Sequence, residues 1–528
     1  MTCEARSRGA ISRPKRAGAV AALVLLGVLM GCGAAEEGGE SGPRWLVVGI
    51  DGADWGVING LWQEGNLPHL RALAERGVAG VLRTSYGVSP VIWTTVATGV
   101  VPEVHGITGF AVPTSDGDVP VSSRVRKVPA LWNMLTGAGR RTAVVSWWAT
   151  WPAERIAGVV VSDRATMKVG DRLSPPELQE RFDRWREQAH VEENFFDERL
   201  STAWRDHVTQ IAARQLLDVD FDLVMVYFRG VDIASHRYWK YFEPERFDDV
   251  KSEAVEELGS IVPQTYEATD AAIGRLVEKL GPETNVMVLS DHGFLALERE
   301  KVRVLLDFDQ ILVRLGFQRR ADGKVAWEGT ELYTYASAKS SLRKRIRYAP
   351  DVADAAKEEI RQHLADELAK VAYAGGEPAF LVRGAGERER RTGADFVVEV
   401  LPDGATLDLY HDDERWRRAI QKVNVISGSH GKNTHGVIFA AGPDVDPAAT
   451  LDGIHIHDIA PTLLYGLGLP VAEDFAGRAW LELFSDRFRS SRALRTIPSW
   501  GVIGEGETLA STVDEEILDD LRALGYID

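Results

Sequence analysis

Cysteine is almost absent from this chain of 528 residues, which has only Cys3 and Cys32. Both lie near the N-terminus, so the rest of the chain can form no disulfide among its own residues and hold no metal through a thiolate. A basic excess is also missing, because the formal net charge is −17. We therefore expect no nucleic-acid binding, since phosphate backbones demand a basic surface. Hydrophobic residues make up 45% of the chain, enough for a large core or one large domain with an insertion.

The N-terminal segment resembles a bacterial lipoprotein signal. Basic residues between Arg6 and Arg16 precede an apolar run, residues 17–30, that is too short for a comfortable membrane span. The run ends in Leu29-Met30-Gly31-Cys32, which is similar to a lipobox. This pattern predicts a signal peptide over 1–31, a lipidated Cys32 and a flexible tether over 32–43. Such a protein would be anchored in the bacterial cell envelope, facing the periplasm or the exterior; an ordinary signal peptide and an uncleaved anchor are the alternatives.

From Arg44 onward, apolar strands alternate with amphipathic helices, which predicts an α/β fold with a mostly parallel sheet sandwiched by helices. The expected strands are Trp45–Ile50, Thr142–Trp147, Leu223–Phe228, Val286–Ser290 and Val437–Ala441, and the expected helices include Ala130–Gly139, Thr202–Leu217 and Tyr266–Leu280. Charged runs interrupt this rhythm between 300 and 422, where Phe396–Leu401 indicates an antiparallel strand. We expect a core over 44–299 and 423–485, a smaller inserted α+β cap subdomain over 300–422, and a tail over 486–528 that ends in a short helix.

Acidic residues and histidines follow the predicted strands. Asp51 ends the first strand, and Asp291-His292 end the strand that begins at Val286. Ligands of α/β sheets bind beyond the carboxyl ends of the strands, and Asp and His are ligands that suit zinc or manganese. These positions therefore predict a metal-dependent active site at that edge of the sheet.

Two further segments carry candidate metal ligands. Asp232 and His236 are four residues apart, a spacing that places both side chains on one face of a helical turn. His430 and His435 both precede the strand that begins at Val437, and either could supply a histidine ligand. An isolated Asp–His ion pair and a structural histidine are the simpler alternatives for these two segments.

A hydroxyl-rich segment, residues 89–99, contains the candidate nucleophile. Ser89 followed by Pro90 predicts an N-cap and first helical residue, which would place the Ser89 hydroxyl beside unpaired backbone N–H groups. Thr94 and Thr95 would fall inside this helix, where their hydroxyls tend to bond to carbonyls one turn earlier. Ser89 is therefore the predicted nucleophile, and a plain helix cap is the alternative role for it.

Taken in order, these motifs resemble the type I phosphodiesterase/nucleotide pyrophosphatase family of the alkaline phosphatase superfamily, most closely its phosphohydrolase/phosphomutase-like subgroup. The resemblance covers about 44–291 and 428–477 and includes a helix-and-turn segment at 458–470. It rests on Asp51-Gly52, on Ser89 before Thr98-Gly99, on Asp232-x-x-x-His236, on Ser290-Asp291-His292-Gly293, and on His430 before the strand that leads to Gly442-Pro443.

The resemblance implies an alkaline-phosphatase-like core and a hydrolase of phosphoric esters that uses two divalent metal ions. Asp51, Asp291 and His292 would hold one ion, with Ser89 as the nucleophile beside it. Asp232, His236 and His430 would hold the other. Zinc suits these ligands, with manganese and iron as alternatives. Two ions would clamp the attacking and leaving oxygens while a seryl-phosphate forms.

The expected substrate is a small phosphate ester, monoester or diester, or a lipid headgroup. A phosphomutase or phosphotransferase on the same site is one alternative. The export signal argues against a mutase, because an enzyme that acts on a soluble cytoplasmic sugar phosphate would not need to be exported. A non-catalytic envelope module that retains the fold is another. A sulfatase is disfavoured, because Ser89-Pro90-Val91 has neither Pro nor Ala two residues after the serine and no Arg four residues after it.

The lipid anchor leads to a direct prediction. Replacing Cys32 by Ala removes the only sulfur that could carry lipid after cleavage, so Cys32→Ala should release the protein from membranes or stall its processing. Membrane fractionation and intact-mass measurement check this outcome. Wild-type protein found soluble in the cytoplasm with Met1 still in place would contradict the anchor.

Overall fold

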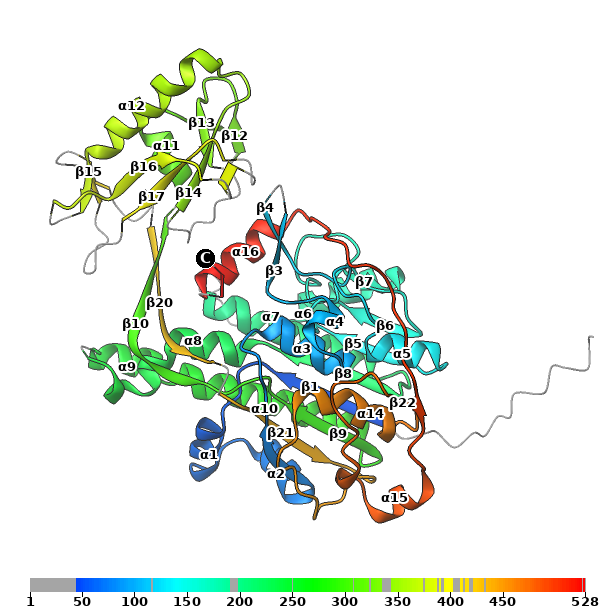
Figure 1. Ribbon diagram of the computed structural model, residues 1–528. Coiled ribbons are helices and arrows are strands. Elements are labelled where there is room, and N and C mark those ends of the chain that lie inside the picture. The colour runs from blue at the N-terminus through cyan, green and yellow to red at the C-terminus, as the bar shows by residue number, and fades with distance from the viewer. Residues whose placement is uncertain are drawn as a thin grey trace, which may run out of the picture. The chain divides into compact units, whose positions relative to one another are not determined.

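A central sheet of eight strands organises the chain in the computed structural model (Figure 1). Its order is β2-β21-β9-β1-β8-β5-β6-β7. The strands are β1 Arg44–Ile50, β2 Val78–Leu82, β5 Thr142–Val145, β6 Gly158–Val161, β7 Leu173–Ser174, β8 Leu223–Phe228, β9 Thr284–Leu289 and β21 Gly436–Ala441. All five strands expected from the sequence are present, and the α/β class is confirmed.

The structure describes residues 44–114, 117–189, 198–248, 250–306, 308–321, 324–334, 343–373, 376–386, 389–390, 394–401, 409–411, 414–416, 421–431, 434–524 and 526–527. The predicted signal peptide, 1–31, and tether, 32–43, lie outside these residues. None of the helices described is long and apolar enough to cross a membrane.

The sheet is mostly parallel, as the alternation of strands and helices predicts. Strand β1 pairs in parallel with β8 on one side and β9 on the other, and β5 pairs in parallel with β8 and β6. Strand β21 is antiparallel to both β9 and β2, and β7 is antiparallel to β6. Because β1, β8 and β9 run the same way, their carboxyl ends meet at one edge of the sheet.

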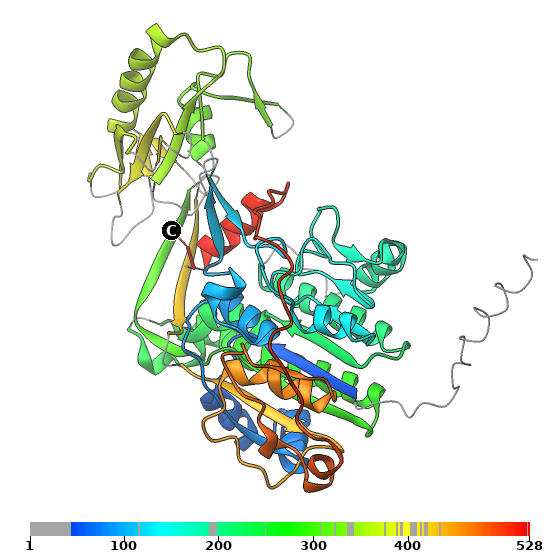
Figure 2. The same ribbon diagram turned by 45° about the vertical axis from the view of Figure 1, so that its right-hand side comes forward.

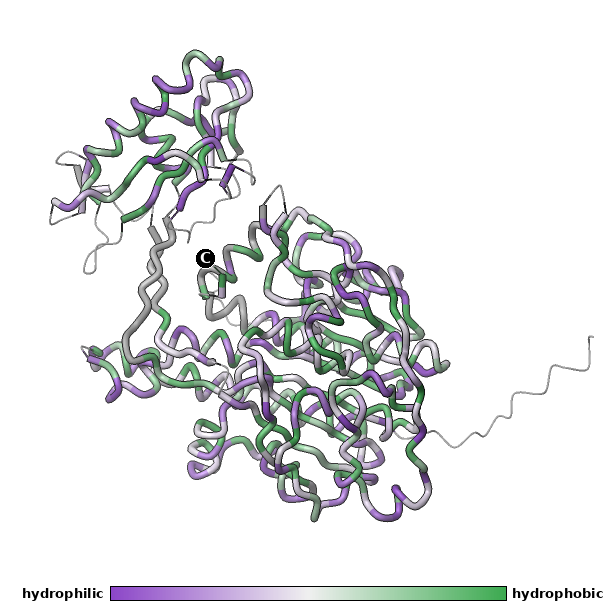
Figure 3. The backbone as a smooth tube through the Cα atoms, viewed as in Figure 1, coloured by the Kyte–Doolittle hydropathy of each residue, from purple (hydrophilic) through white to green (hydrophobic). Residues whose placement is uncertain are grey.

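Helices cover both faces of this sheet. As a result, every residue of β1 beyond Arg44 is buried. Successive side chains of a strand point to opposite faces. Leu46, Val48 and Ile50 pack in one hydrophobic cluster, whereas Trp45 and Val47 pack in a second cluster on the other face. In Figure 3 hydrophobic stretches, in green, alternate with hydrophilic ones, in purple, along the tube of the core.

The two faces are covered by different helices. The first cluster includes side chains from α1 Trp55–Gln63, α2 Pro68–Arg76, α6 Gln179–Gln188, α7 Glu198–Leu216, α8 Gly230–Phe242 and α10 Ile261–Leu280. The second includes side chains from α3 Ser89–Thr98, α5 Leu131–Gly137, α14 Ile459–Gly466 and α15 Asp486–Ser491. Helices α5, α7 and α10 confirm the three helices expected from the sequence.

The segment between the core strands has a hydrophobic cluster of its own. It is connected through the antiparallel pair β10 Leu295–Leu306 and β20 Gln421–Ser429. Its elements are α11 Phe308–Arg314, β11 Arg319–Ala321, β12 Lys324–Ala326, β13 Leu332–Thr334, β14 Arg343–Tyr348, α12 Lys357–Ala369, β15 Val371–Tyr373, β16 Phe380–Gly384, β17 Phe396–Val400, β18 Leu409–His411 and β19 Glu414–Trp416. The antiparallel strand predicted from Phe396 is β17, which pairs with β14 and β16. The domain boundaries and the role as a cap stay predictions.

The remaining short elements flank the core. They are α4 Pro102–His105, the hairpin β3 Ala111–Thr114 and β4 Gly117–Pro120, α9 Ser252–Leu258, β22 Val471–Ala472, β23 Thr496–Ile497 and α16 Asp514–Ala523. Helix α16 is the short helix expected at the end of the tail.

Candidate metal centre

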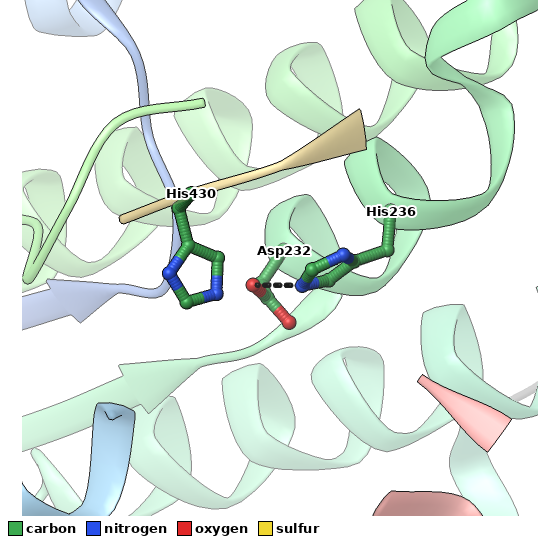
Figure 4. A group of neighbouring side chains, drawn as sticks. All are labelled: Asp232, His236 and His430. Carbon is green, nitrogen blue, oxygen red and sulfur yellow. Dashed lines mark ion pairs between the residues drawn. The ribbon is translucent and has the colours of Figure 1, made fainter. Parts of the chain in front are cut away.

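Two groups of acidic and histidine side chains meet at the carboxyl ends of the central strands. Asp51 follows β1, and Asp291 and His292 follow β9. Asp232 and His236 lie on α8, and His430 follows β20 (Figure 4). Within each group the candidate ligand atoms all lie within 4.8 Å of one another. The structure thus brings together the six residues predicted as ligands, in the same two groups; their role as ligands stays a prediction.

Glycine is required where β1 turns into the centre. Gly52 has a φ of +72°, and a Cβ at this position would lie 3.0 Å from the backbone of Asp232. Its N–H donates to Asp291 Oδ1 at 3.2 Å. The Asp51-Gly52 pair therefore lets α8 approach the end of β1, which brings the two groups together.

The spacing of Asp232 and His236 has the predicted effect. Both side chains lie on the same face of α8, with His236 Nε2 3.4 Å from Asp232 Oδ1 (Figure 4). His236 Nδ1 lies 3.0 Å from the carbonyl oxygen of Gly428, a contact that places the ring proton on Nδ1. Nε2 faces Asp232, an orientation that suits a metal ligand.

His430 and His435 occupy different surroundings. The His430 ring stacks on that of His292, with centroids 3.6 Å apart and an interplanar angle of 12°. The His435 side chain is exposed, and its Nδ1 accepts from the N–H of Thr84 at 3.4 Å. Of the two alternatives left open by the sequence, only His430 lies in a candidate metal group among the described residues.

The two groups share His292 as a neighbour. Its Nε2 lies 3.4 Å from Asp51 Oδ1 and 3.4 Å from Asp291 Oδ2, and 4.0 Å from Asp232 Oδ1 of the other group. Two ions held here would lie close enough to contact one phosphoryl group.

The unpaired polar atoms of this centre fit bound cations. Five of the six predicted ligands have a buried atom without a hydrogen-bond partner among the described residues. These atoms are Asp232 Oδ1, Asp291 Oδ2, His236 Nε2, His292 Nε2 and His430 Nδ1. Leaving a buried acceptor unsatisfied costs about 1–3 kcal/mol. A divalent ion in each group would satisfy these atoms, so the donor set fits the metals that the motifs imply.

The crowding of buried carboxylates shifts the pKa values of ionisable groups in this centre. Burial raises the pKa of Asp291 well above its usual value, and the neighbouring Asp51 carboxylate raises it further. Burial alone would lower the pKa of His292, but the Asp291 and Asp51 carboxylates raise it to about 10. Burial alone would raise the pKa of Asp51, but the adjacent, positively charged His292 ring holds it below its usual value. The proton on His292 therefore partly offsets the negative charge that a cation would neutralise.

Two tyrosines that the sequence analysis missed bind these carboxylates. The Tyr227 hydroxyl donates to Asp51 Oδ2, and the Tyr526 hydroxyl donates to Asp232 Oδ2. Burial and the neighbouring aspartates raise the pKa of both phenols well above the usual value, so both keep their protons. Tyr227 lies in the otherwise apolar strand β8, and its polar hydroxyl was the sequence signal that could have indicated this contact. Tyr526 is 294 positions from Asp232, and no local pattern connects them.

Ser89 lies at the centre, one position away from its predicted helical role. Val88 is the N-cap of α3, because its carbonyl accepts from the N–H groups of Val91 and Ile92. The prediction of Ser89 as N-cap is therefore wrong by one residue. The Ser89 side chain is nevertheless at the end with free N–H groups, is 1% exposed, and donates to Asp51 Oδ1 at 3.3 Å.

The two threonines of α3 differ from each other. Thr95 donates back to the carbonyl of Val91 at 2.9 Å, as predicted. The buried Thr94 hydroxyl has no hydrogen-bond partner among the described residues, so the same expectation is wrong for Thr94. Ser89 is thus the hydroxyl of this segment that contacts a predicted metal ligand.

Comparisons with known proteins identify a family. The model of the family described as type I phosphodiesterase/nucleotide pyrophosphatase matches residues 45–431, which include the six predicted ligands and Ser89. No curated protein matches the chain.

Solved structures resemble the chain at low identity. Murine ectonucleotide pyrophosphatase/phosphodiesterase 5 is 15% identical with a TM-score of 0.42, covering 84% of this chain and 100% of its own. An inactive variant of that protein, in complex with AMP, is 16% identical with the same TM-score and the same coverage of both chains. Phosphonoacetate hydrolase from Sinorhizobium meliloti 1021, in complex with phosphonoformate, is 15% identical with a TM-score of 0.43, covering 80% of this chain and 95% of its own.

A pair of alanine variants tests the choice between the two histidines. His430→Ala removes a side chain of the second group and should lose one bound ion, together with activity. His435→Ala, five positions away, should keep both ions. Elemental analysis after equilibrium dialysis against zinc or manganese measures the stoichiometry. If His435→Ala loses an ion and His430→Ala does not, the assignment of His430 as a ligand is wrong.

Metal binding should also release protons. With a pKa raised to about 10, His292 carries a proton at pH 7–8, and a cation can bind Nε2 only when that proton leaves. The affinity of the first group should therefore rise with pH below about 10, by about tenfold per pH unit for each proton released. Calorimetric titration in buffers of different ionisation enthalpy measures this release. Binding without proton release would contradict the protonated state of His292.

Proposed function

The chain belongs to the type I phosphodiesterase/nucleotide pyrophosphatase family of phosphoester hydrolases, and we propose that it hydrolyses phosphoric esters with two divalent ions and Ser89 as nucleophile. The observation that carries the proposal is the pairing of two ligand groups, in which every residue but His430 is buried, with a serine hydroxyl 3.3 Å from a carboxylate oxygen of one group. Fold, ligand types and hydroxyl position all suit one in-line displacement at phosphorus.

The six side chains divide into two ligand sets. Asp51, Asp291 and His292 would hold the ion beside Ser89, and Asp232, His236 and His430 would hold the second. When bound, the ions supply positive charge for the phosphoryl oxygens and lower the pKa of a coordinated hydroxyl. Oxygen and imidazole ligands without thiolates suit zinc, and also manganese or iron.

The chain itself positions the nucleophile. The hydrogen bond to Asp51 Oδ1 orients Ser89 Oγ, and its place in the first turn of α3 puts free backbone N–H groups beside any phosphoryl oxygen. Ser89 Oγ would form a bond to phosphorus as the bond to the leaving oxygen breaks. The serine proton would pass to solvent, and the leaving group would depart as an alcohol with a proton taken from solvent. Water would then attack the seryl-phosphate, releasing phosphate or a monoester and restoring the serine.

The substrate we propose is a small phosphate ester or a lipid headgroup ester. The net charge of −17 disfavours polyanionic nucleic acid. The lipoprotein-like N-terminus supports a membrane-anchored enzyme that acts in the bacterial envelope, where lipid headgroups are within reach. Transfer of the phosphoryl group to an acceptor alcohol is the second candidate, and a mixture of water and alcohol acceptors would distinguish transfer from hydrolysis.

A substrate panel tests the proposed chemistry. Purified protein loaded with zinc or manganese should cleave p-nitrophenyl phosphate or bis(p-nitrophenyl) phosphate, and the ratio of the two rates identifies a monoesterase or a diesterase. Removal of metal by chelation should abolish both rates, and re-addition should restore them. A metal-loaded protein that cleaves neither these esters nor phospholipid headgroups would support a non-catalytic role.

Ser89→Ala should lower turnover by on the order of 10³-fold or more, because a covalent nucleophile is lost, while the metal content stays the same. Thr94→Val is the matched control, since it removes a buried hydroxyl of the same helix and preserves the side-chain volume. It should retain most of the activity. Mass spectrometry of acid-quenched enzyme should find the phosphoryl group on Ser89. A phosphoryl group on Thr94 or Thr95, or full activity in Ser89→Ala, would overturn the covalent role of Ser89.

A further inference from the structure

The end of the chain reaches the candidate metal centre. Figures 1 and 2 both show α16, drawn in red, beside the β3–β4 hairpin, and α16 contacts β4. Three residues after α16, Tyr526 donates its hydroxyl hydrogen bond to Asp232 Oδ2. This residue lies outside the range that the family model matches, 45–431. Its partner Asp232 lies inside that range, so the contact joins a residue of the matched region to one beyond it.

Ring contacts hold Tyr526 in place. Its ring stacks on Phe110 with centroids 4.5 Å apart and an interplanar angle of 17°. It also meets the edge of His236, with centroids 5.1 Å apart. Such aromatic pairs stabilise the packing beyond the burial of their area. The phenol is thus fixed between a hydrophobic wall and one of the predicted ligands.

A buried ion pair anchors the helix that carries Tyr526. Arg164, whose side chain is 3% exposed, lies 3.0 Å from Asp514 at the start of α16. Arg164 also donates to Ser511 Oγ and to the carbonyl of Val121. Residues Ile517, Asp520 and Leu521 of α16 line a cavity together with Tyr227 and Phe110. Helix α16 is therefore packed into the core beside the centre.

The contact made by Tyr526 repeats the contact made by Tyr227. In each case a phenol donates to Oδ2 of an aspartate, and Oδ1 of the same aspartate faces the cluster. Asp51 Oδ1 accepts from Ser89 and lies 3.4 Å from His292 Nε2. Asp232 Oδ1 lies 3.4 Å from His236 Nε2 and accepts no hydrogen bond from the described residues. Each candidate metal group thus has one carboxylate held by one tyrosine.

We propose that Tyr526, supplied by the C-terminal segment, is a positioning residue for the second metal ion. Its hydroxyl holds Asp232 Oδ2, so that Oδ1 points to the place where Asp232, His236 and His430 converge. The inference rests on the proposed function, because it assigns Tyr526 to a metal group of that site. Hydrogen-bond partners of ligating carboxylates fix their orientation, and losing such a partner lowers metal affinity by about 10–100-fold.

The test compares two tyrosine-to-phenylalanine variants of the full chain. Tyr526→Phe keeps the stacked ring and removes only the hydroxyl. Tyr465→Phe is the matched control, because its hydroxyl donates to the carbonyl of Arg492 at 3.0 Å, and Tyr465 belongs to neither metal group. Chelator-competition titration with Zn²⁺ measures the two binding constants of each variant. Thermal denaturation checks that both variants fold.

Tyr526→Phe should weaken one of the two binding constants by about 10–100-fold and leave the other unchanged. Tyr465→Phe should change neither. Unchanged zinc affinity in Tyr526→Phe would overturn the positioning role. Tighter zinc binding in Tyr526→Phe would also overturn it, because the tyrosine hydroxyl would then hinder metal binding in the wild type. A wild-type protein that binds no metal would overturn the proposed function, and this inference with it.

A double-mutant cycle tests whether α16 delivers the tyrosine. Asp514→Asn weakens the ion pair with Arg164 and should lower the affinity for the same ion. In the Tyr526→Phe background, Asp514→Asn should cause no further loss, because the hydroxyl that it positions is already absent. Fully additive losses would show that α16 affects the metal independently of Tyr526, and would overturn delivery through this helix.

Discussion

Three buried carboxylates at one edge of a sheet set the constraint on which this structure depends. Asp51, Asp232 and Asp291 are each at most 3% exposed, and their oxygens surround His292. Two like charges 4 Å apart repel by about 4 kcal/mol at an effective dielectric constant of 20. Without cations, His292 and Asp291 offset this repulsion by their raised pKa values. Divalent ions would offset it more completely, and they would convert a destabilising cluster into a centre for phosphoryl chemistry.

The parallel arrangement of β1, β8 and β9 concentrates these groups. Because the three strands are adjacent and run the same way, Asp51, Asp291 and the start of α8 leave the sheet at one edge. Gly52 permits the close approach of α8, and the Ser89 end of α3 meets the same edge. The covering helices hold this edge through two hydrophobic clusters, so the positions of the ligands depend on the packing of the whole core.

Segments that lie outside the central sheet complete the centre. His430 arrives at the end of β20, after the inserted segment, and Tyr526 arrives three residues beyond α16. The family match includes His430 and ends before Tyr526. Both candidate metal groups therefore lie in the part of the chain that the family model matches. The tyrosine, which lies beyond that part, donates to a carboxylate of one of them.

The sequence by itself determined the α/β class and five strands of the central sheet, and it marked candidate ligands through apolar runs that end in acids and a four-residue Asp–His spacing. The division of these ligands into two metal groups came from the family resemblance and not from local signals. Local signals also locate the start of a helix only to within about one residue, because the N-cap of α3 is Val88 and not Ser89. Tertiary structure placed His430 in the centre, as the resemblance implied, and it alone decided that His435 is exposed and that Tyr227 and Tyr526 donate to Asp51 and Asp232. The reason is physical, because these contacts depend on how distant segments pack together, and no periodicity along the chain records that packing.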